Sequence, residues 1–216
     1  MAPVQAQKII NFGRFLLTRT AVLLAAAALL SAGLVNYSTM RIKMLNRVVP
    51  ASVEDLALFF LNPDKASPPN WDKYILYFRT AAKVMPGFSA PNAMMGYCYF
   101  YKGDLAKAAG YYRLARAQTP TFFWFHYNLG VIYYRQGRYE EAAAVLKKAV
   151  SCRPEDAIVF INVSKIYRDL NRAATDAGYD PEEGLVEGYR NAQQMILACT
   201  NHLQHLLQND FSVRIF

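Results

Sequence analysis

The sequence predicts an all-α protein: an N-terminal transmembrane helix followed by an α-solenoid of stacked helical hairpins. Two observations carry this prediction. Residues 89–122 and 123–156 match each other at a constant offset of 34 residues. A period of this length is typical of stacked helical units rather than of a fold with one central core. Residues 20–40 contain no charged side chain, and roughly twenty apolar residues cross a bilayer as a helix.

The N-terminal part divides into a basic tail at 1–19 and the uncharged stretch at 20–40. Three interpretations compete for this stretch. A cleaved signal peptide needs a basic start, an apolar core and a small-residue cleavage site, and 31–33 offers an imperfect one. A buried helix of a soluble protein is the second, although so long an uncharged run is unusual there. We favour the third, a retained membrane anchor.

The orientation of this anchor follows only weakly from charge. Three basic residues precede the stretch and three follow it closely, so the positive-inside comparison is a tie. A short basic N-terminal tail is usually retained in the cytoplasm. The sequence therefore predicts a single-pass protein, in a bacterial inner membrane, with its repeats on the periplasmic side.

The next part, 41–88, is expected to hold irregular membrane-proximal helices and a degenerate repeat. A first helix is expected over about 51–61, ended by Pro63, and the proline-rich stretch 62–70 is expected to be a loop. The residues that match the end of a repeat are Phe78, Ala81 and Pro86.

Each clear repeat has the residues that a helical hairpin needs. Gly96 and Gly130 allow the two helices of a hairpin to approach closely, because glycine has no Cβ. Gly103 and Gly137 stand where the first helix must end, which suits a residue that tolerates positive φ. A proline ends the second helix of each repeat. The large side chains expected to fill the hairpins are Tyr99, Tyr112, Tyr133 and Leu146.

These motifs resemble the tetratricopeptide repeat family. Residues 123–156 fit its pattern except near the start, where His126 replaces the usual aromatic residue. Residues 89–122 fit with Asn92 at that position and Met95 in place of leucine. The resemblance implies that the first helices of successive repeats line a concave groove.

Carried over position by position, the resemblance implies an aromatic groove with a basic end. We predict that it binds a protein partner, as an extended peptide or a helix with apolar anchors and an acidic end. Tyrosine, tryptophan and arginine often dominate binding energy at interfaces. The alternative is that these aromatic residues are core. The predicted partner-binding residues are Tyr97, Phe100, Tyr101, Trp124, Tyr127, Asn128, Tyr134, Arg135, Lys165 and Arg168.

The last part, 157–216, is expected to be a degenerate repeat that starts with Phe160 and Tyr167. An inserted loop is expected over 171–184, followed by a C-terminal capping helix. Cys199, His202 and His205 recur there every three residues, but these positions drift around a helix and no fourth ligand is evident. We therefore predict no metal and no cofactor.

The composition limits the class of function. The net charge is +8, but the chain has neither a dense Lys/Arg run nor a nucleic-acid recognition motif, so we do not expect nucleic-acid binding. Common catalytic motifs are missing from the sequence, so an enzyme is not predicted. The predicted function is a membrane-anchored interaction scaffold, acting as an accessory subunit or assembly factor. The alternatives are a homo-oligomeric structural protein and a metal- or haem-handling maturation helper.

Overall fold

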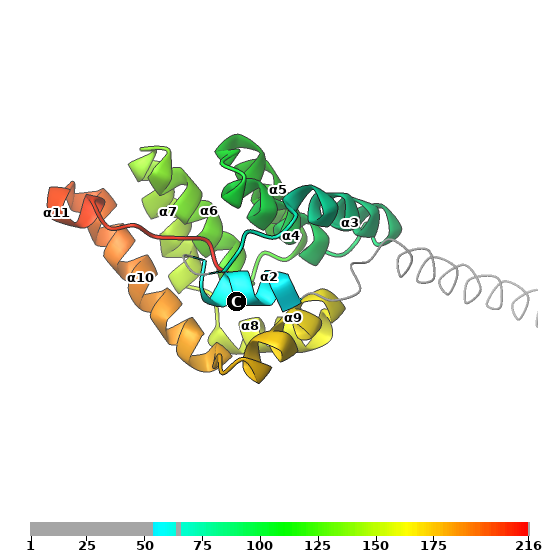
Figure 1. Ribbon diagram of the computed structural model, residues 1–216. Coiled ribbons are helices and arrows are strands. Elements are labelled where there is room, and N and C mark those ends of the chain that lie inside the picture. Colours follow the sequence, from blue (N-terminus) through cyan, green and yellow to red (C-terminus); the bar gives the residue numbers. More distant parts are fainter. Residues whose placement is uncertain (1–53, 64–65, 216) are drawn as a thin grey trace, which may run out of the picture. The chain divides into compact units, whose positions relative to one another are not determined.

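The computed structural model describes residues 54–63 and 66–215, and these residues form only helices and the segments that connect them (Figure 1). The prediction of an all-α, tetratricopeptide-like arrangement is confirmed for this part of the chain. The helices, in chain order, are α2 Glu54–Leu61, α3 Trp71–Val84, α4 Ala90–Tyr101, α5 Leu105–Gln118, α6 Phe123–Arg135, α7 Tyr139–Val150, α8 Pro154–Val163, α9 Lys165–Asp176, α10 Pro181–Asn201 and α11 Gln204–Leu207.

The membrane prediction needs a correction. Across residues 54–63 and 66–215, every helix is too short or too polar to cross a bilayer. Even α10, with 21 residues, carries Glu182, Glu183 and Glu187. This finding contradicts the predicted localisation as a single-pass membrane protein, which we do not retain. The basic tail at 1–19 and the stretch at 20–40 lie outside the described residues.

The two clear repeats form the hairpins α4–α5 and α6–α7, and their internal contacts are equivalent. A Cβ added to Gly96 of α4 would lie 2.8 Å from the ring of Tyr112 in α5. A Cβ added to Gly130 of α6 would lie 2.5 Å from Cγ of Leu146 in α7. Both pairs are separated by the same number of residues. The predicted close approach of paired helices at these glycines is confirmed.

The turns inside the hairpins also follow the prediction. Gly103 and Gly137 end the first helix of each hairpin with φ of 82° and 72°, in the left-handed region that favours glycine. Asp104 then begins α5 by accepting a hydrogen bond from the main-chain N–H of Lys107. Each of these turns therefore sets the residue at which the first helix of its hairpin ends and the second begins.

The tyrosines at equivalent positions differ in burial. Tyr133 is buried, as predicted, but Tyr99 is partly exposed and stacks on Tyr111, with ring centroids 5.4 Å apart. The guanidinium of Arg138 lies 4.3 Å above the ring of Tyr133, whereas the ammonium of Lys107 lies 5.2 Å above that of Tyr99. The closer, planar cation covers its ring and the more distant one leaves its ring open to solvent.

The helix expected over about 51–61 is present as α2, and the expected loop at 62–70 separates it from α3. The helix α3 packs against α4 at the start of the stack, while α2 lies against α9, much later in the chain. Phe59 of α2 contacts the rings of Trp71 and Tyr101, and Phe60 contacts that of Tyr179. These aromatic contacts place α2 on the inner side of α4.

The part after the repeats departs from the predicted third hairpin. A helix break at Ser164 separates α8 from α9, and it brings the rings of Phe160 and Tyr167 to 5.2 Å. In one continuous helix, residues seven apart would be about 10.5 Å apart along the axis. Both rings also contact the ring of Phe122, which immediately precedes α6.

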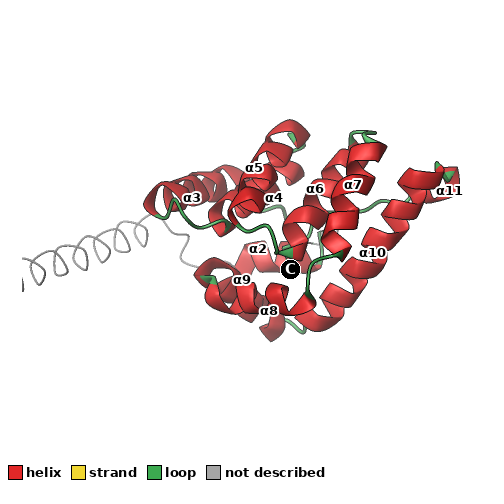
Figure 2. Ribbon diagram, turned by 180° about the vertical axis from the view of Figure 1, so that it is seen from behind, coloured by secondary structure: helices red, strands yellow, loops and turns green. Residues whose placement is uncertain are grey.

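The inserted loop expected over 171–184 is mostly helical. The helix α9 continues to Asp176, and α10 begins at Pro181 and runs without interruption to Asn201. The helix α10 packs against α7, in the place beside the last repeat where a further hairpin would stand (Figure 2). The pair α8–α9 instead folds back toward α2 and α4.

Candidate protein-interaction groove

The helix α6 is the centre of the candidate site because it is surrounded on every side. Each residue from Phe123 to Tyr134 is buried. A helix that is apolar all round is a buried helix, in contrast to one with a polar outer face. One side of α6 meets α7, and its start meets α8 and α10. Part of the remaining face is covered by residues 209–215, which we call the inner segment.

The inner segment runs without helical turns from α11 back past α6 toward α2 (Figure 1). Its side chains alternate in burial: Phe211, Val213 and Ile215 are buried, while Ser212 and Arg214 are partly exposed. Alternation with a period of two is the signature of an extended chain with one apolar side. The segment therefore lies in the groove as an extended peptide would.

Asn128 of α6 binds the main chain of this segment twice. Its Oδ1 accepts a hydrogen bond from the N–H of Arg214 at 2.8 Å, and its Nδ2 donates to the carbonyl of the same residue at 2.6 Å. Asn128 is 1 % exposed. A buried amide that pairs both its donor and its acceptor with the main chain of one residue recognises backbone, whatever side chain that residue carries.

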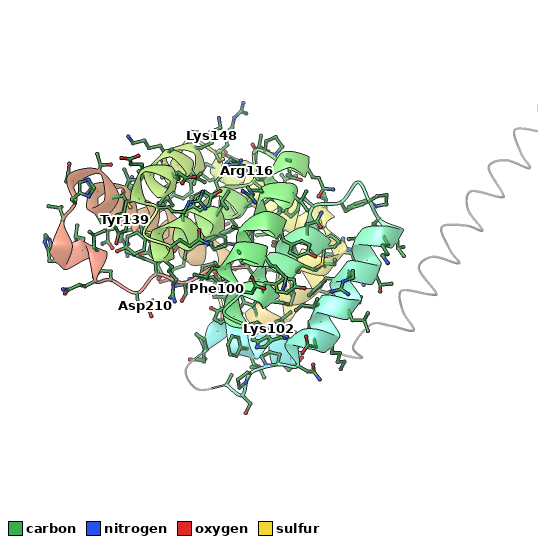
Figure 3. All side chains as sticks on the ribbon, turned by 90° about the horizontal axis from the view of Figure 1, so that it is seen from above. Phe100, Lys102, Arg116, Tyr139, Lys148 and Asp210 are labelled. Carbon is green, nitrogen blue, oxygen red and sulfur yellow. The ribbon has the colours of Figure 1, made fainter. Side chains whose placement is uncertain are left out.

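Arg135, at the other end of α6, binds the segment at two neighbouring residues. Its Nε donates to the carbonyl of Phe211 at 2.9 Å, and its Nη2 pairs with the carboxylate of Asp210. The guanidinium lies 5.0 Å from the ring centroid of Phe100 in α4. Figure 3 labels Phe100 and Asp210, the two residues that Arg135 joins.

These contacts fix the direction of the inner segment. Asn128 binds Arg214 and Arg135 binds Phe211, so the segment runs antiparallel to α6. Seven helical residues rise about 10.5 Å. Three extended residues span about 10 Å. The two distances agree, so an extended chain can use both anchors at once.

Tyr134 and α10 complete the walls of the groove. The hydroxyl of Tyr134 donates to the carbonyl of Leu206 at 2.9 Å, and its ring meets that of Phe211 edge-on. Burial raises the pKa of Tyr134 to about 12. On the opposite wall, Glu187 of α10 accepts from Nη2 of Arg214 at 2.9 Å.

Two hollows lie beside the inner segment. One of about 540 Å³ is bordered by residues 209–214 and by Tyr127, Asn191 and Gln194, among others. A second of about 450 Å³ lies between the end of α2 and the start of α10. Glu187 and Arg214 border both hollows. The groove therefore has free volume next to the segment, at the charged pair.

The predicted partner-binding residues divide into three sets in the structure. Asn128, Tyr134 and Arg135 bind the inner segment directly. The aromatic residues Tyr97, Phe100, Tyr101, Trp124 and Tyr127 lie around them, and all of these except Tyr101 are fully buried. These aromatic residues pack in the interior, while the role of the set in partner binding stays a prediction.

Lys165 and Arg168 form the third set and lie apart from the segment. Nζ of Lys165 pairs with Asp169 at 2.6 Å, and Nη1 of Arg168 donates to the carbonyl of Asn162. The basic end that the sequence placed on these residues is therefore bound to α8 and α9 themselves. Within the described chain, the basic end of the groove is Arg135.

The candidate metal residues do not converge. Cys199 is buried in α10, His202 ends that helix with a left-handed φ of 48°, and His205 belongs to α11. In residues 54–63 and 66–215, no three Cys, His, Asp or Glu side chains are placed to hold a metal ion.

Sequence reasoning missed Glu187 and the inner segment itself. The signal for the segment was present, because Phe211, Val213 and Ile215 alternate with polar residues. No pattern in the sequence marked Glu187, since its role depends on where α10 packs.

Residues 93–157 match a family model of the tetratricopeptide repeat. The match covers α4 to α7 and the start of α8, and it supports the family resemblance for this part of the chain. Repeats of this kind are typically interaction modules rather than catalysts. A search of curated proteins found no significant match to the chain.

Proposed function

We propose that this chain is a protein–protein interaction scaffold whose groove holds an extended segment of a partner along α6. One observation carries the proposal: Asn128 is buried and binds both the main-chain N–H and the main-chain carbonyl of a single residue, Arg214. Such a contact is available to any extended chain. The role of an accessory subunit or assembly factor fits this site, because it docks a partner and performs no chemistry on it.

Three further features support an extended partner over a helical one. Asn128 and Arg135 both bind main-chain atoms of the inner segment. A helix has its carbonyl and N–H groups engaged internally and cannot offer them along its side. The spacing of the anchors on α6 also matches an extended chain, as shown above. Buried apolar side chains at every second residue then supply binding energy.

The inner segment competes with any partner because it is tethered to the same chain. A tethered segment has an effective concentration that can reach the millimolar range. The test therefore uses the full chain with Phe211, Val213 and Ile215 each replaced by serine, which weakens the tethered occupant. The probe is a fluorescein-labelled peptide with the sequence of residues 208–215, QNDFSVRI. Fluorescence anisotropy measures its binding.

We expect the serine variant to bind the peptide at least tenfold more tightly than the native chain. Adding Asn128→Ala to the serine variant should abolish the gain, and a peptide of scrambled sequence should not bind. A single Phe211→Ala variant provides the same test with less disturbance if the triple variant is unstable. Absence of binding, in a variant whose α6 amides remain protected from hydrogen exchange, would refute the proposal.

A further inference from the structure

We infer that the partner segment carries an acidic residue directly before an aromatic one and a basic residue three positions after that aromatic, and that it enters by displacing the inner segment. This inference rests on the proposed function and specifies its partner. The template is the chain's own pattern: Asp210 and Phe211, then Arg214, with apolar residues at every second position.

The acidic position follows from the placement of Arg135. Its guanidinium lies over the ring of Phe100 in α4, a contact that does not depend on the occupant of the groove, and its Nε donates to the main-chain carbonyl of the aromatic residue of the occupant, here Phe211. A second nitrogen of the guanidinium, Nη2, pairs with the carboxylate of the residue that precedes the aromatic one. The side chain of Arg135 is 33 % exposed, so this position is also open to an approaching partner.

The basic position follows from Glu187. Its Oε1 accepts from Arg214 at 2.9 Å, and this side chain is 45 % exposed. The two hollows at this pair leave room for a longer or differently directed cation. An acidic side chain at the same position would face Glu187 directly, and like charges at close range are unfavourable.

The two charges lie at opposite ends of the groove and therefore select one direction of the partner. A peptide bound in the reverse direction would bring its acidic residue toward Glu187 and its basic residue toward Arg135. Both contacts would then be repulsive. The hydrogen bonds from Asn128 alone carry no side-chain preference, so the charges and the apolar positions supply specificity.

Displacement requires that the inner segment leave without dismantling the groove. The wall formed by α10 is held separately, because Tyr189 stacks on Phe123 with ring centroids 4.3 Å apart and donates to the carbonyl of Cys152. Between this wall and the segment stands His202, a non-glycine residue with φ of 48°. Such a conformation is unfavourable for a residue with a Cβ. The joint after α10 is thus the strained point at which the segment can turn away.

The charge rule is tested on the full-length serine variant with three further peptides: Asp210→Lys, Arg214→Glu, and both changes together. We expect each single reversal to weaken binding about three- to tenfold relative to QNDFSVRI, and the double reversal to weaken it further. The matched control is Glu187→Arg in the same variant. It should weaken the parent peptide and strengthen the Arg214→Glu peptide, so that the order of the two is inverted.

The outcomes separate this inference from the proposed function. If the parent peptide binds and the reversed peptides bind equally well, the charge rule is wrong and the scaffold proposal stands. If none binds, the scaffold proposal itself fails.

Displacement is measured on the native chain. Saturating parent peptide should remove the hydrogen-exchange protection of the Arg214 amide while α6 stays protected. Unchanged protection would overturn displacement. A third outcome is that the native chain forms dimers without peptide and loses the protection of the Arg214 amide when it does so. The occupant of the groove would then be the segment of a second copy, and the inference of a different partner would be wrong.

Discussion

The hairpins α4–α5 and α6–α7 and the region from α8 to the inner segment are held together by different kinds of contact. In the hairpins, the decisive contacts join residues close in sequence, such as Gly130 with Leu146, and they recur in the neighbouring unit. After α7 the decisive contacts do not recur. Asn128 binds Arg214, 86 residues later, and Phe60 meets Tyr179. Contacts between residues close in sequence thus determine the structure of the two hairpins, whereas long-range contacts with the surface of these hairpins determine the course of the chain after α7.

The helix α10 shows what this difference means. It occupies the place of a repeat helix beside α7, but it is held there by its own features. A Cβ on Gly188 would lie 2.5 Å from Cη2 of Trp124, so only glycine lets α10 approach that ring without a shift. The contact of Gly188 with Trp124 is as close as that of Gly130 with Leu146, but it joins α10 to α6 and not two helices of one hairpin.

The largest expected effect comes from Trp124→Ala, which removes the side chain that joins the two regions. Trp124 is 2 % exposed, and loss of a buried tryptophan costs about 3–5 kcal/mol of the free energy of unfolding. Urea denaturation measures it. Trp71→Ala is the control, because Trp71 is only partly buried and should cost less. Equal losses would mean that α10 is not firmly attached to the repeats.

A second prediction tests the local rule of the hairpins. Gly130→Ala places a Cβ 2.5 Å from the buried Cγ of Leu146 and should destabilise the protein by about 1–3 kcal/mol. Gly110→Ala in α5 meets nothing within 4 Å and should instead stabilise by about 0.5–1 kcal/mol, since alanine favours helix. Thermal unfolding of both variants measures the sign and size of each change in stability. The same sign for both would show that helix propensity, and not close packing, governs these positions.

A third prediction concerns the attachment of α10 at its other contact. Tyr189→Phe keeps the ring stacked on Phe123 but removes the hydrogen bond to the Cys152 carbonyl, at a cost of about 0.5–1.5 kcal/mol. Because the acceptor is main chain, the loss should be the same in a Cys152→Ala background. Chemical denaturation of the four combinations measures it. Strong coupling between the two substitutions would contradict this account.

The smallest effect is a pH dependence of the repeats through His126. Burial lowers the pKa of His126, and the nearby Arg116 and Lys148 act in the same direction, although a hydrogen bond to the Pro120 carbonyl partly opposes them. Below the ordinary histidine pKa of about 6.5, the unfolded chain then binds more protons than the folded one. Stability should therefore fall as the pH drops through that value toward the lowered pKa.

This pH effect is isolated by comparison with His126→Gln. Urea unfolding at several pH values between 7.5 and 5 should show a shallower loss of stability for the variant, since carboxyl groups titrate alike in both proteins. Parallel curves would mean that His126 has the same pKa in the folded and unfolded states.

The two regions also differ in how much of their structure can be predicted from the sequence. The spacing of Gly96, Gly103, Gly130 and Gly137 predicts both hairpins and their turns, because each contact lies within one unit or its neighbour. The break at Ser164 and the course of α10 are not encoded in such spacing. They arise from the packing of Phe160 and Tyr167 on Phe122, which joins residues that no local pattern relates.

The candidate site shows the same limit. Asn128, Tyr134 and Arg135 are identified by the family pattern as residues of the concave face, and the structure brings all three into contact with the inner segment. What the family pattern cannot supply is the occupant. The alternation of Phe211, Val213 and Ile215 indicates an extended chain, but its pairing with α6 depends on the tertiary path of α10 and α11.

The antiparallel match between α6 and the inner segment has a consequence for insertions and deletions. An extended chain turns each successive side chain to the opposite side, so one residue added between Phe211 and Arg214 would exchange the inward and outward sets. One residue added to the turn between α5 and α6 would leave the faces of both helices as they are. A change of length by one residue thus alters which side chains of the inner segment face α6, whereas it leaves the buried face of a helix the same.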